Sequence, residues 1–273
     1  MNRRWYIPLT TLALLLGSAA AAGSASASTS AMSAPAVHKS TVQPAIVHGF
    51  RPGGAMIKTG GKTAAGKGSV FADQSSNWSG YAVTGGTNAF NSVSASWTEP
   101  SVSCSGRAFS SFWVGLDGFN SQSVEQTGTD SDCGAFGGAK YYGWYEMFPA
   151  APVNFSNPVS PGDSMSASVT VSGDNYTLSL TDNTKGWNQT IHQTQSGLSN
   201  SSAEVITEAP SSGSGVLPLA DFHTVNYSGA SDNGSSMGSQ NPTQIIMVGN
   251  NGDKDSTSGI SGGSFSNTWI SSN

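Results

Sequence analysis

Short stretches in which apolar and polar residues alternate run through the chain from about residue 90 onward. In residues 92–98 (S-V-S-A-S-W-T) every second position is apolar, and residues 164–172 and 176–180 repeat the pattern on either side of the turn S-G-D-N. Strict alternation predicts half-buried β-strands, and a polar turn between two of them predicts a hairpin. Further strands are expected at 111–116, 141–148, 204–208 and 244–249. No stretch keeps apolar residues at helical spacing for three turns.

Strands this short, separated by turns rich in Gly, Asn, Asp and Ser, are typical of an antiparallel β-sandwich. We therefore predict an all-β fold of two packed sheets. Aromatic residues recur regularly only from Phe71 onward, starting with Trp78 and Tyr81. The folded domain is accordingly expected to span residues 71–273, which is long enough for one sizeable core.

The first 70 residues have a different composition. Residues 1–27 combine Arg3 and Arg4, an apolar run centred on Leu12–Leu16, and the small-residue sequence Ala25-Ser26-Ala27. This combination predicts a signal peptide, too short to anchor the chain in a membrane, and hence a secreted, soluble protein. Residues 28–70 are rich in Ala, Ser, Gly, Pro and Thr, and such a composition is expected to bury too little apolar surface to offset chain entropy.

Basic and acidic residues are segregated along the chain. All 16 acidic residues lie after residue 71, where only four basic residues (Arg107, Lys140, Lys185 and Lys254) oppose them, a formal charge of −12. Residues 28–70 carry five basic residues and no acidic one. This contrast suggests a basic pro-segment that covers an acidic cleft until acid neutralises the cleft, with a flexible secretion spacer as the alternative. The acidic domain is expected to tolerate acid better than alkali and not to bind nucleic acid.

Cys104 and Cys133 are the only cysteines in the chain. In an exported protein two cysteines are expected to pair. The resulting loop would enclose Asp117 and Gln126 and stabilise the fold by roughly 3–4 kcal/mol.

The common signatures of hydrolases and metal sites are missing or incomplete. The stretches G-S-S-M-G (234–238) and G-I-S-G-G (259–263) have nucleophile-elbow spacing, but His223 is the last histidine and precedes both, so they are interpreted as turns. No D-T-G, H-E-x-x-H or C-x-x-C occurs, which argues against a paired-aspartate protease and a zinc site. The stretch 251–255 (N-G-D-K-D) lacks the terminal glutamate of a calcium loop. No metal or other cofactor is expected.

The remaining candidates for chemistry are carboxylates beside amides. Because strand side chains alternate, three sets of residues should each share one sheet face: Glu204, Ile206 and Glu208; Val124, Gln126 and Gly128; and Trp144, Glu146 and Phe148. A partly buried carboxyl among apolar neighbours has a raised pKa, which suits an acid/base catalyst. For each acid taken singly, the alternative is an ordinary outward-facing strand residue.

Six stretches in order along the chain carry a more specific signal: S-N-W-S-G-Y (76–81), F-W-V-G-L-D-G (112–118), V-E-Q-T-G-T-D (124–130), Y-Y-G-W-Y-E-M-F-P (141–149), A-E-V-I-T-E-A-P (203–210) and L-P-L-A-D-F (217–222). Through them the chain resembles the glutamic peptidases, the eqolisin family of secreted acid proteases, from about residue 75 to residue 250. The resemblance implies a legume-lectin-like sandwich of two curved sheets, with a polypeptide substrate across the concave face. It also implies activity that pepstatin does not inhibit, and we expect a monomer.

The resemblance makes Gln126 the catalytic glutamine and Glu208 the catalytic glutamate. It assigns five further residues to the lining, support or edge of the cleft: Trp78, Trp113, Asp117, Asp130 and Glu146. A glutamine amide donates hydrogen bonds at any pH, whereas an ionised carboxylate cannot. Glu208 is therefore expected to activate water and later protonate the amine, while Gln126 stabilises the tetrahedral oxygen. The chain departs from fungal relatives at Phe148, where they have tyrosine, and at 209–210.

Two alternatives come from other functional classes. A secreted lectin-like sandwich could stack polysaccharide on its many Trp and Tyr side chains. A glycoside hydrolase could use a carboxylate pair such as Glu204 and Glu146.

Overall fold

The computed structural model describes residues 50–51, 54–63 and 72–273, all within one compact unit, Val42–Asn273. The expected signal peptide (1–27) and most of the expected pro-segment lie outside the described residues. Among the residues that the structure does describe, no helix is long and apolar enough to cross a bilayer.

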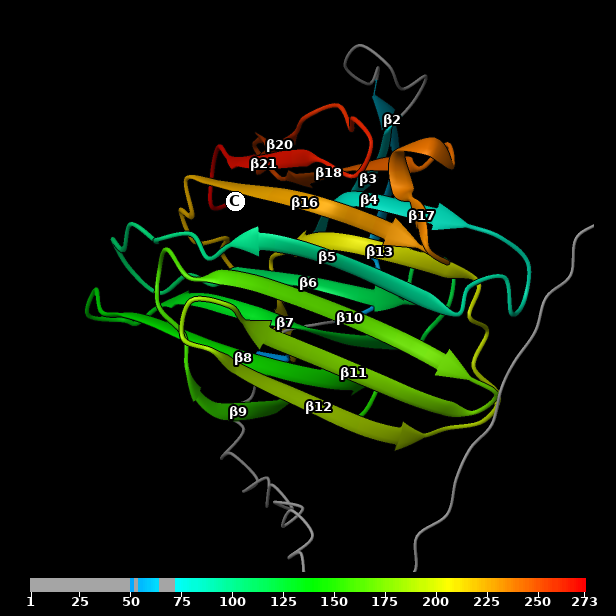
Figure 1. Cartoon of the computed structure of the whole chain (residues 1–273). Coiled ribbons are helices and arrows are strands. Elements are labelled where there is room, and N and C mark those ends of the chain that lie inside the picture. The colour runs from blue at the N-terminus through cyan, green and yellow to red at the C-terminus, as the bar shows by residue number, and fades with distance from the viewer. Residues whose placement is uncertain (1–49, 52–53, 64–71) are drawn as a thin grey trace, which may run out of the picture. The chain divides into compact units, whose positions relative to one another are not determined.

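Two large sheets packed face to face make up the fold, and Figure 1 looks onto the smaller one. The eight-stranded sheet contains, in order across it, β12 (Trp187–Thr194), β11 (Asn175–Asp182), β10 (Ser164–Ser172), β5 (Ser92–Thr98), β16 (Thr224–Asp232), β21 (Phe265–Trp269) and β20 (Asp255–Thr257), with β17 (Ser235–Ser236) paired to β16. The ten-stranded sheet contains β2 (Lys58–Thr63), β3 (Ala72–Ser75), β18 (Thr243–Gly249), β4 (Trp78–Thr84), β13 (Ser202–Glu208), β6 (Ser111–Leu116), β7 (Val124–Cys133), β8 (Ala139–Phe148) and β9 (Val153–Pro158), with β19 (Gly252–Asp253) paired to β18.

The prediction of an antiparallel all-β sandwich is confirmed. Its one exception among the described strands is the parallel pair of β3 and β18. The predicted hairpin is formed by β10 and β11, which pair from Met165↔Asp182 to the turn at Ser172↔Asn175. Each of the other stretches expected to be strands is also a strand.

The core between the sheets explains the alternation in the sequence. On β5, the side chains of Val93, Ala95 and Trp97 are buried, while the serines between them are partly exposed. The ten-stranded sheet contributes Phe112 and Val114 from β6 to the same core. The central strands β6 and β13 are buried on both faces, so their sequences do not alternate.

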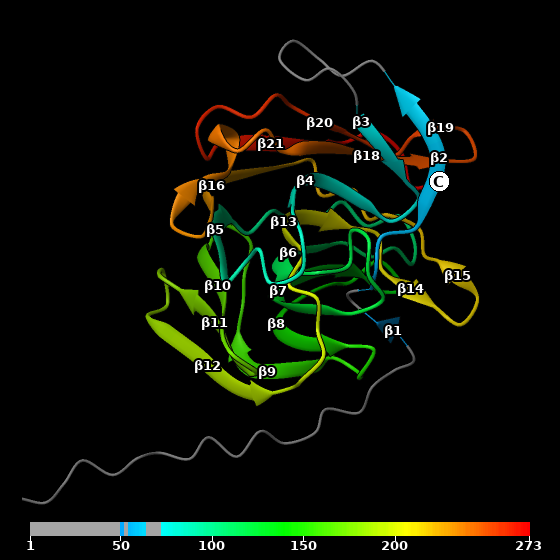
Figure 2. The same ribbon diagram turned by 90° about the vertical axis from the view of Figure 1, so that its right-hand side faces the viewer.

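The face of the ten-stranded sheet that is turned away from the eight-stranded sheet is called here the outer face. Figure 2 shows a small third sheet on this side, in which β1 (Phe50–Arg51), β14 (Ser211–Ser212) and β15 (Gly215–Val216) pair in that order. A separate cluster of buried apolar side chains covers the outer face: Met56, Trp78, Ala82, Trp113, Phe119, Val124, Trp144, Ile206 and Ile245. The central strands of this sheet are therefore covered by side chains on both faces, unlike the strands of a simple two-layer sandwich.

The segment before residue 71 is more ordered than its composition predicts. Strand β2 pairs with β3 at the edge of the ten-stranded sheet, and Met56 is buried on the outer face. Met56 is thus buried although the composition of residues 28–70 predicts little burial, whereas residues 57–60 are exposed. The physical reason is that this segment needs no core of its own, because it uses a sheet edge and an apolar surface that the rest of the chain supplies.

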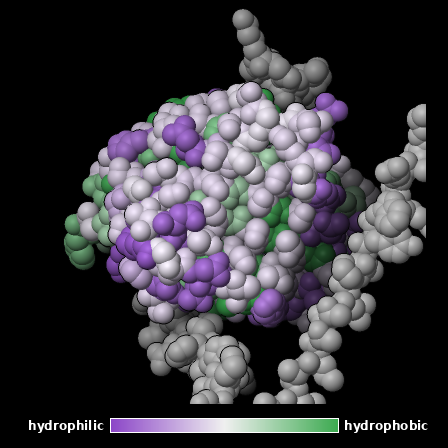
Figure 3. Space-filling view, viewed as in Figure 1, coloured by the Kyte–Doolittle hydropathy of each residue, from purple (hydrophilic) through white to green (hydrophobic). Residues whose placement is uncertain are grey.

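The opposite surface, which belongs to the eight-stranded sheet, is polar. Figure 3 shows it mostly in pale and purple colours. Rows of small hydroxyl side chains cover β5 and β10, including Ser94, Ser96, Ser166 and Ser168, and the hydroxyls of Ser96 and Ser166 bond across the strands at 2.9 Å. The aromatic and acidic residues that the sequence singled out lie on the other sheet.

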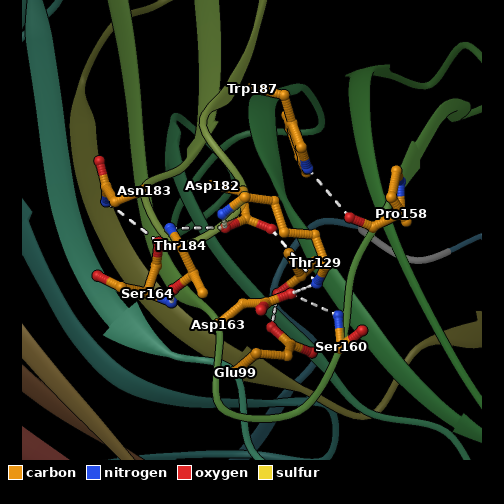
Figure 4. Close-up of polar contacts among 11 residues, drawn as sticks. Glu99, Thr129, Pro158, Ser160, Asp163, Ser164, Asp182, Asn183, Thr184 and Trp187 are labelled. Carbon is orange, nitrogen blue, oxygen red and sulfur yellow. Dashed lines mark hydrogen bonds and ion pairs between the residues drawn. The ribbon is translucent and has the colours of Figure 1, made fainter.

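Ion pairs are few in the part of the chain that is described. Lys185 pairs with Asp163 and, at 3.8 Å, with Asp182, and His223 lies 3.4 Å from Asp221. Figure 4 shows the two aspartates of the first cluster close together. Protonation of the carboxylates would therefore break few favourable charge pairs, as the sequence composition led us to expect.

Candidate active site

The register of the ten-stranded sheet brings most of the predicted residues onto the outer face in parallel rows. One row contains Trp78, Glu208, Ser111, Asp130 and Tyr142, one residue from each of five adjacent strands. A row two positions along each strand contains Ile206, Trp113, Gly128 and Trp144, and the next contains Glu204, Gly115, Gln126 and Glu146. Residues paired in register point to the same side of a sheet. Glu208 and Gln126 therefore share one face.

Glu208 ends β13 and is fully buried. Its two carboxyl oxygens accept hydrogen bonds from different donors, Trp113 Nε1 at 2.9 Å and Asn77 Nδ2 at 3.3 Å. Burial raises the pKa of Glu208 well above its usual value, and the nearby charge of Glu146 raises it further, while the two donors oppose this shift. Such a carboxyl can exchange a proton in a range where ordinary glutamates are already ionised.

Gln126 is equally buried and lies in the middle of the sheet on β7. Its amide nitrogen donates a hydrogen bond to Oε2 of its register partner Glu146 over 2.9 Å. This contact sets the orientation of the amide, because a carboxylate oxygen accepts from an N–H and not from a carbonyl. Among the described residues, no donor reaches the Oε1 atom of Gln126. The amide nitrogen is thus engaged by Glu146, while the amide oxygen has no donor among the described residues.

Glu146 connects the two candidates electrostatically. It accepts the hydrogen bond of Gln126, and its charge acts on Glu208. Asp130 is the third carboxyl of the group, and it accepts hydrogen bonds from Trp144 Nε1 at 2.7 Å and from Tyr142 at 2.9 Å. Burial raises the pKa of Asp130 to about 7, against the lowering effect of its hydrogen bonds. Several carboxyls that share a dry surface favour protonated forms, which suits a site that works in acid.

The indole of Trp113 lies between the rows of Glu208 and Gln126, and two glycines lie close to this residue. A Cβ atom at Gly128 would lie 2.6 Å from Cβ of Trp113, and one at Gly115 would lie 2.9 Å from the Trp113 ring. Trp78 packs edge-on against Trp113 with 4.9 Å between ring centroids. A Cβ atom at Gly128, the glycine of the Q-T-G sequence, would also lie 2.1 Å from the carbonyl oxygen of Phe112, so this glycine is required by the close approach of the β6 backbone.

Two of the acidic residues named from the sequence, Asp117 and Glu204, lie apart from the hydrogen bonds of Glu208 and Gln126. Asp117 accepts hydrogen bonds from the backbone N–H groups of Asn200 and Ser201 at 2.7 and 2.8 Å, so it fixes the loop before β13. Glu204 is buried near Asp117 and Glu125, and burial is the main cause of its strongly raised pKa. Neither has a hydrogen bond to Glu208 or Gln126 within the described part of the chain.

The predicted disulfide between Cys104 and Cys133 is confirmed, with 5.3 Å between the Cα atoms. It ties the end of β7 to the loop before β6. The stretch 234–238 forms a two-residue strand and the start of a three-residue 3-10 helix, Met237–Ser239, and not the turn alone that the sequence indicated. Within the described residues, no three His, Cys, Asp or Glu side chains are grouped so as to hold a metal ion.

Two residues of the site were not predicted from the sequence. Asn77 donates to Glu208 across a sequence separation of 131 residues, so only the folded chain brings them together. Glu99 lies on the inner face behind the site and accepts hydrogen bonds from Thr129 and Ser131, the neighbours of Asp130 (Figure 4 shows Glu99 and Thr129). Burial raises the pKa of Glu99 to about 7. The S-N-W sequence contained Asn77, but nothing in its spacing distinguished it from a turn residue.

Residues 54–57 lie against this site. The backbone N–H of Met56 donates to the carbonyl of Gly118 at 3.0 Å, and Asn77 Nδ2 donates to the carbonyl of Ala55 at 3.3 Å. A Cβ atom on Gly54 would lie 3.8 Å from the ring of Phe148. Through Asn77, which contacts both Ala55 and Glu208, the segment lies next to the buried Glu208 carboxyl.

Comparison with known proteins agrees with this geometry. The Peptidase A4 family matches residues 76–269. Aspergillopepsin-2 of Aspergillus niger is 28% identical over 233 residues, which cover 74% of this chain and 80% of the relative. Scytalidopepsin B of Scytalidium lignicola is 35% identical over 139 residues, about half of each chain (49% and 51%).

Among solved structures, a scytalido-glutamic peptidase bound to a transition state analog inhibitor superposes with a TM-score of 0.63 at 30% identity, covering 71% of this chain and 98% of the other. The aspergilloglutamic peptidase of Aspergillus niger gives a TM-score of 0.53 at 27% identity, covering 60% and 99%. The match to the family extends over most of the chain and includes every row of the outer face. The chain therefore belongs to the Peptidase A4 family and is a glutamic-type endopeptidase.

Proposed function

We propose that the chain is a secreted acid endopeptidase in which Glu208 and Gln126 carry out the hydrolysis of peptide bonds. The observation that carries this proposal is that both side chains are buried on the outer face of one sheet and are linked through Glu146. One partner titrates and the other does not, so the pair can hold a proton and an uncharged hydrogen-bond donor at the same time.

In the proposed reaction, the Glu208 carboxylate takes a proton from water as the water oxygen bonds to the substrate carbonyl carbon. The carbonyl oxygen becomes negatively charged and accepts a hydrogen bond from the amide nitrogen of Gln126. When the C–N bond breaks, Glu208 returns its proton to the leaving nitrogen. The role of Gln126 is worth on the order of 3–4 kcal/mol for one such donor.

The environment of Glu208 supports an acidic working range. Its pKa is high because burial disfavours the charged form. Removal of the segment that lies beside Glu208 would lessen the burial that causes this upward shift of the pKa. The two opposing donors, Trp113 and Asn77, then stabilise the carboxylate that accepts the proton.

We further propose that residues 28–70 act as an inhibitory pro-segment. Support comes from residues 55–57, which bond to Asn77, Ser76 and Gly118 and place Met56 in the apolar cluster of the outer face. The side chain of Lys58 donates a hydrogen bond to Asn120 Oδ1 at 2.6 Å and lies 4.1 Å from the centre of the Phe119 ring, and it forms no ion pair with any described carboxylate. Because burial raises the pKa of Glu208, its protonation favours the covered state, so acid neutralisation of the cleft would not by itself release the segment.

A digest of casein or denatured haemoglobin in mild acid, with pepstatin present, tests the proposed function. The expected result is release of peptides at a rate that pepstatin does not change. Sugar retention without proteolysis would instead favour a lectin, and release of reducing sugars a glycoside hydrolase. Mass spectrometry of the secreted protein after a shift to acid tests the pro-segment. Full activity with the basic segment still attached would contradict inhibition.

A further inference from the structure

The outer face holds one short segment of this chain in the way that an enzyme holds an extended peptide. Asn77 contacts it twice: its Nδ2 donates to the carbonyl of Ala55 at 3.3 Å, and its Oδ1 accepts from the backbone N–H of Ile57 at 2.8 Å. The carbonyl of Ile57 accepts from the backbone N–H of Ser76 at 3.0 Å. Main-chain bonds of this kind recognise an extended peptide without regard to its sequence.

The same amide nitrogen of Asn77 also donates to Oε1 of Glu208 at 3.3 Å. One nitrogen therefore serves the catalytic carboxyl and the carbonyl of Ala55 together, and the carbonyl lies next to Glu208. A substrate carbonyl bound at this point would be close to the group that activates water.

The side chains of the segment differ sharply in their burial. Met56 is 9% exposed and belongs to the apolar cluster of the outer face, whereas the next residue, Ile57, is 45% exposed. The backbone of Met56 bonds to the carbonyl of Gly118, and a Cβ atom on Gly118 would lie 2.5 Å from Val124 and 2.8 Å from Trp78. Met56 is therefore held beside Gly118, Val124 and Trp78, and it is the one residue of 54–57 that is buried within the apolar cluster.

We propose that the surface under Met56 is the pocket that selects an apolar side chain of the polypeptide substrate, and that Asn77 binds the substrate main chain beside Glu208. Residues 54–57 occupy this site in place of substrate. This inference rests on the proposed function and adds to it a main-chain binding residue and a preference for a long apolar side chain. An acidic cleft alone would have favoured a basic side chain, whereas the side chain that the chain itself places here, Met56, packs in the apolar cluster of the outer face.

Fluorescence anisotropy with a labelled peptide of residues 54–60 (G-A-M-I-K-T-G) tests the pocket without requiring catalysis. The full chain carries its own copy of the segment, which competes at high effective concentration. Met56→Ser in the chain weakens that copy, and loss of one buried methionine corresponds to roughly a 10- to 100-fold change in binding. The Met56→Ser chain should therefore bind the peptide at least about tenfold more tightly than the matched Ile57→Ser chain. Equal binding by the two chains would overturn the pocket.

A second experiment varies the peptide and uses a single chain variant throughout, so differences in folding between chain variants do not enter the comparison. Unlabelled peptides 54–60 with Met, Leu, Ser or Asp at position 56 are used to displace the labelled peptide from the Met56→Ser chain. Met and Leu should displace it at concentrations at least about tenfold lower than Ser and Asp. A series in which all four displace equally well would contradict selection of an apolar side chain.

A double-mutant cycle tests Asn77. An ester in place of the amide between residues 56 and 57 removes the N–H that Asn77 Oδ1 accepts. The ester should weaken binding to a chain with Asn77 several-fold but should change little in an Asn77→Ala chain. An equal loss in both chains would show that Asn77 affects binding only through the stability of the fold. Mass spectrometry verifies that the peptide stays intact.

The design separates failure of this inference from failure of the proposed function. If no polypeptide is hydrolysed in acid, the proposed function fails, while the anisotropy measurements still decide whether the pocket and Asn77 bind the segment. If polypeptides are hydrolysed but the Met56→Ser and Ile57→Ser chains behave alike, the proposed function stands and the pocket assignment is wrong.

Discussion

The indole nitrogen of Trp113 donates a hydrogen bond to Oε2 of Glu208 over 2.9 Å, from the strand next to the one that carries Glu208. The donor stabilises the carboxylate form and so holds the pKa of Glu208 below the value that burial alone would give. Since Trp113 also fills the space between the rows of Glu208 and Gln126, one side chain sets both the packing and the acidity of the site.

Replacing Trp113 with phenylalanine should move the pH profile of hydrolysis. Trp113→Phe removes the donor, so the pKa of Glu208 should rise and the limb of the kcat/KM profile that reports it should shift to higher pH. Trp144→Phe is the matched control, because Trp144 donates to Asp130 and not to Glu208. A profile shifted upward as far by Trp144→Phe as by Trp113→Phe would show that loss of packing, and not of the hydrogen bond, causes the change.

Removing the carboxyl of Glu208 should abolish most activity. Glu208→Gln keeps the size of the side chain but can neither take nor return a proton, and a loss of about 10²- to 10⁴-fold in kcat is expected. Glu204→Gln serves as the comparison, since Glu204 lies on the same strand face and its strongly raised pKa keeps it uncharged in acid. We expect Glu204→Gln to retain activity in a peptide-release assay. Equal loss in both variants would contradict the assignment of Glu208.

Gln126 should contribute to catalysis through the hydrogen-bond donors of its amide. Gln126→Glu preserves the shape but replaces the two N–H groups with a carboxyl beside Glu146, and kcat should fall by about 10²- to 10³-fold with a smaller effect on KM. The measurement is steady-state hydrolysis of a synthetic peptide across acidic pH. Wild-type proteolysis in this variant would refute the division of roles between Glu208 and Gln126.

The folded chain should be more stable in acid than in weak alkali. Burial raises the pKa of Glu99, Asp130 and Asp255 to about 7 and that of Glu125 to about 9. Because the native state holds these protons more tightly than the unfolded state, stability is fully present below pH 4 and is lost as pH rises toward 7–9. The melting temperature should fall by roughly 10 °C or more between pH 4 and pH 8. A lower melting temperature at pH 4 than at pH 8 would contradict this.

Glu125 offers a single-site test of the same linkage. Glu125→Gln cannot ionise, so at pH 8 the unfolded state no longer gains from losing that proton, and the variant should be more stable than wild type by a few kcal/mol. At pH 4 the side chain is uncharged in both proteins, and the two should melt within a few degrees of each other. Calorimetry at the two pH values gives the comparison.

Much of the fold follows from local pattern. The alternation of Val93, Ala95 and Trp97 identified β5, and the turn after Ser172 identified the β10–β11 hairpin, because each strand must place apolar groups on one side only. The pairing of Cys104 with Cys133 was equally open to prediction from the sequence. The same parity put Glu208 with Ile206, and Gln126 with Gly128, on one face of their strands.

The arrangement of the site depended on which strands became neighbours. β13 lies between β4 and β6, and this order brings Trp113 and Asn77 to Glu208 although they are 95 and 131 residues away in the chain. The alternation within a strand is a local property of the sequence. The order of the strands is not local, because segments from all parts of the chain contribute to burying the two faces of the central strands. For the same reason the sequence could not foresee that residues 54–63 would be ordered. A segment without a core of its own takes its structure from the surface it binds.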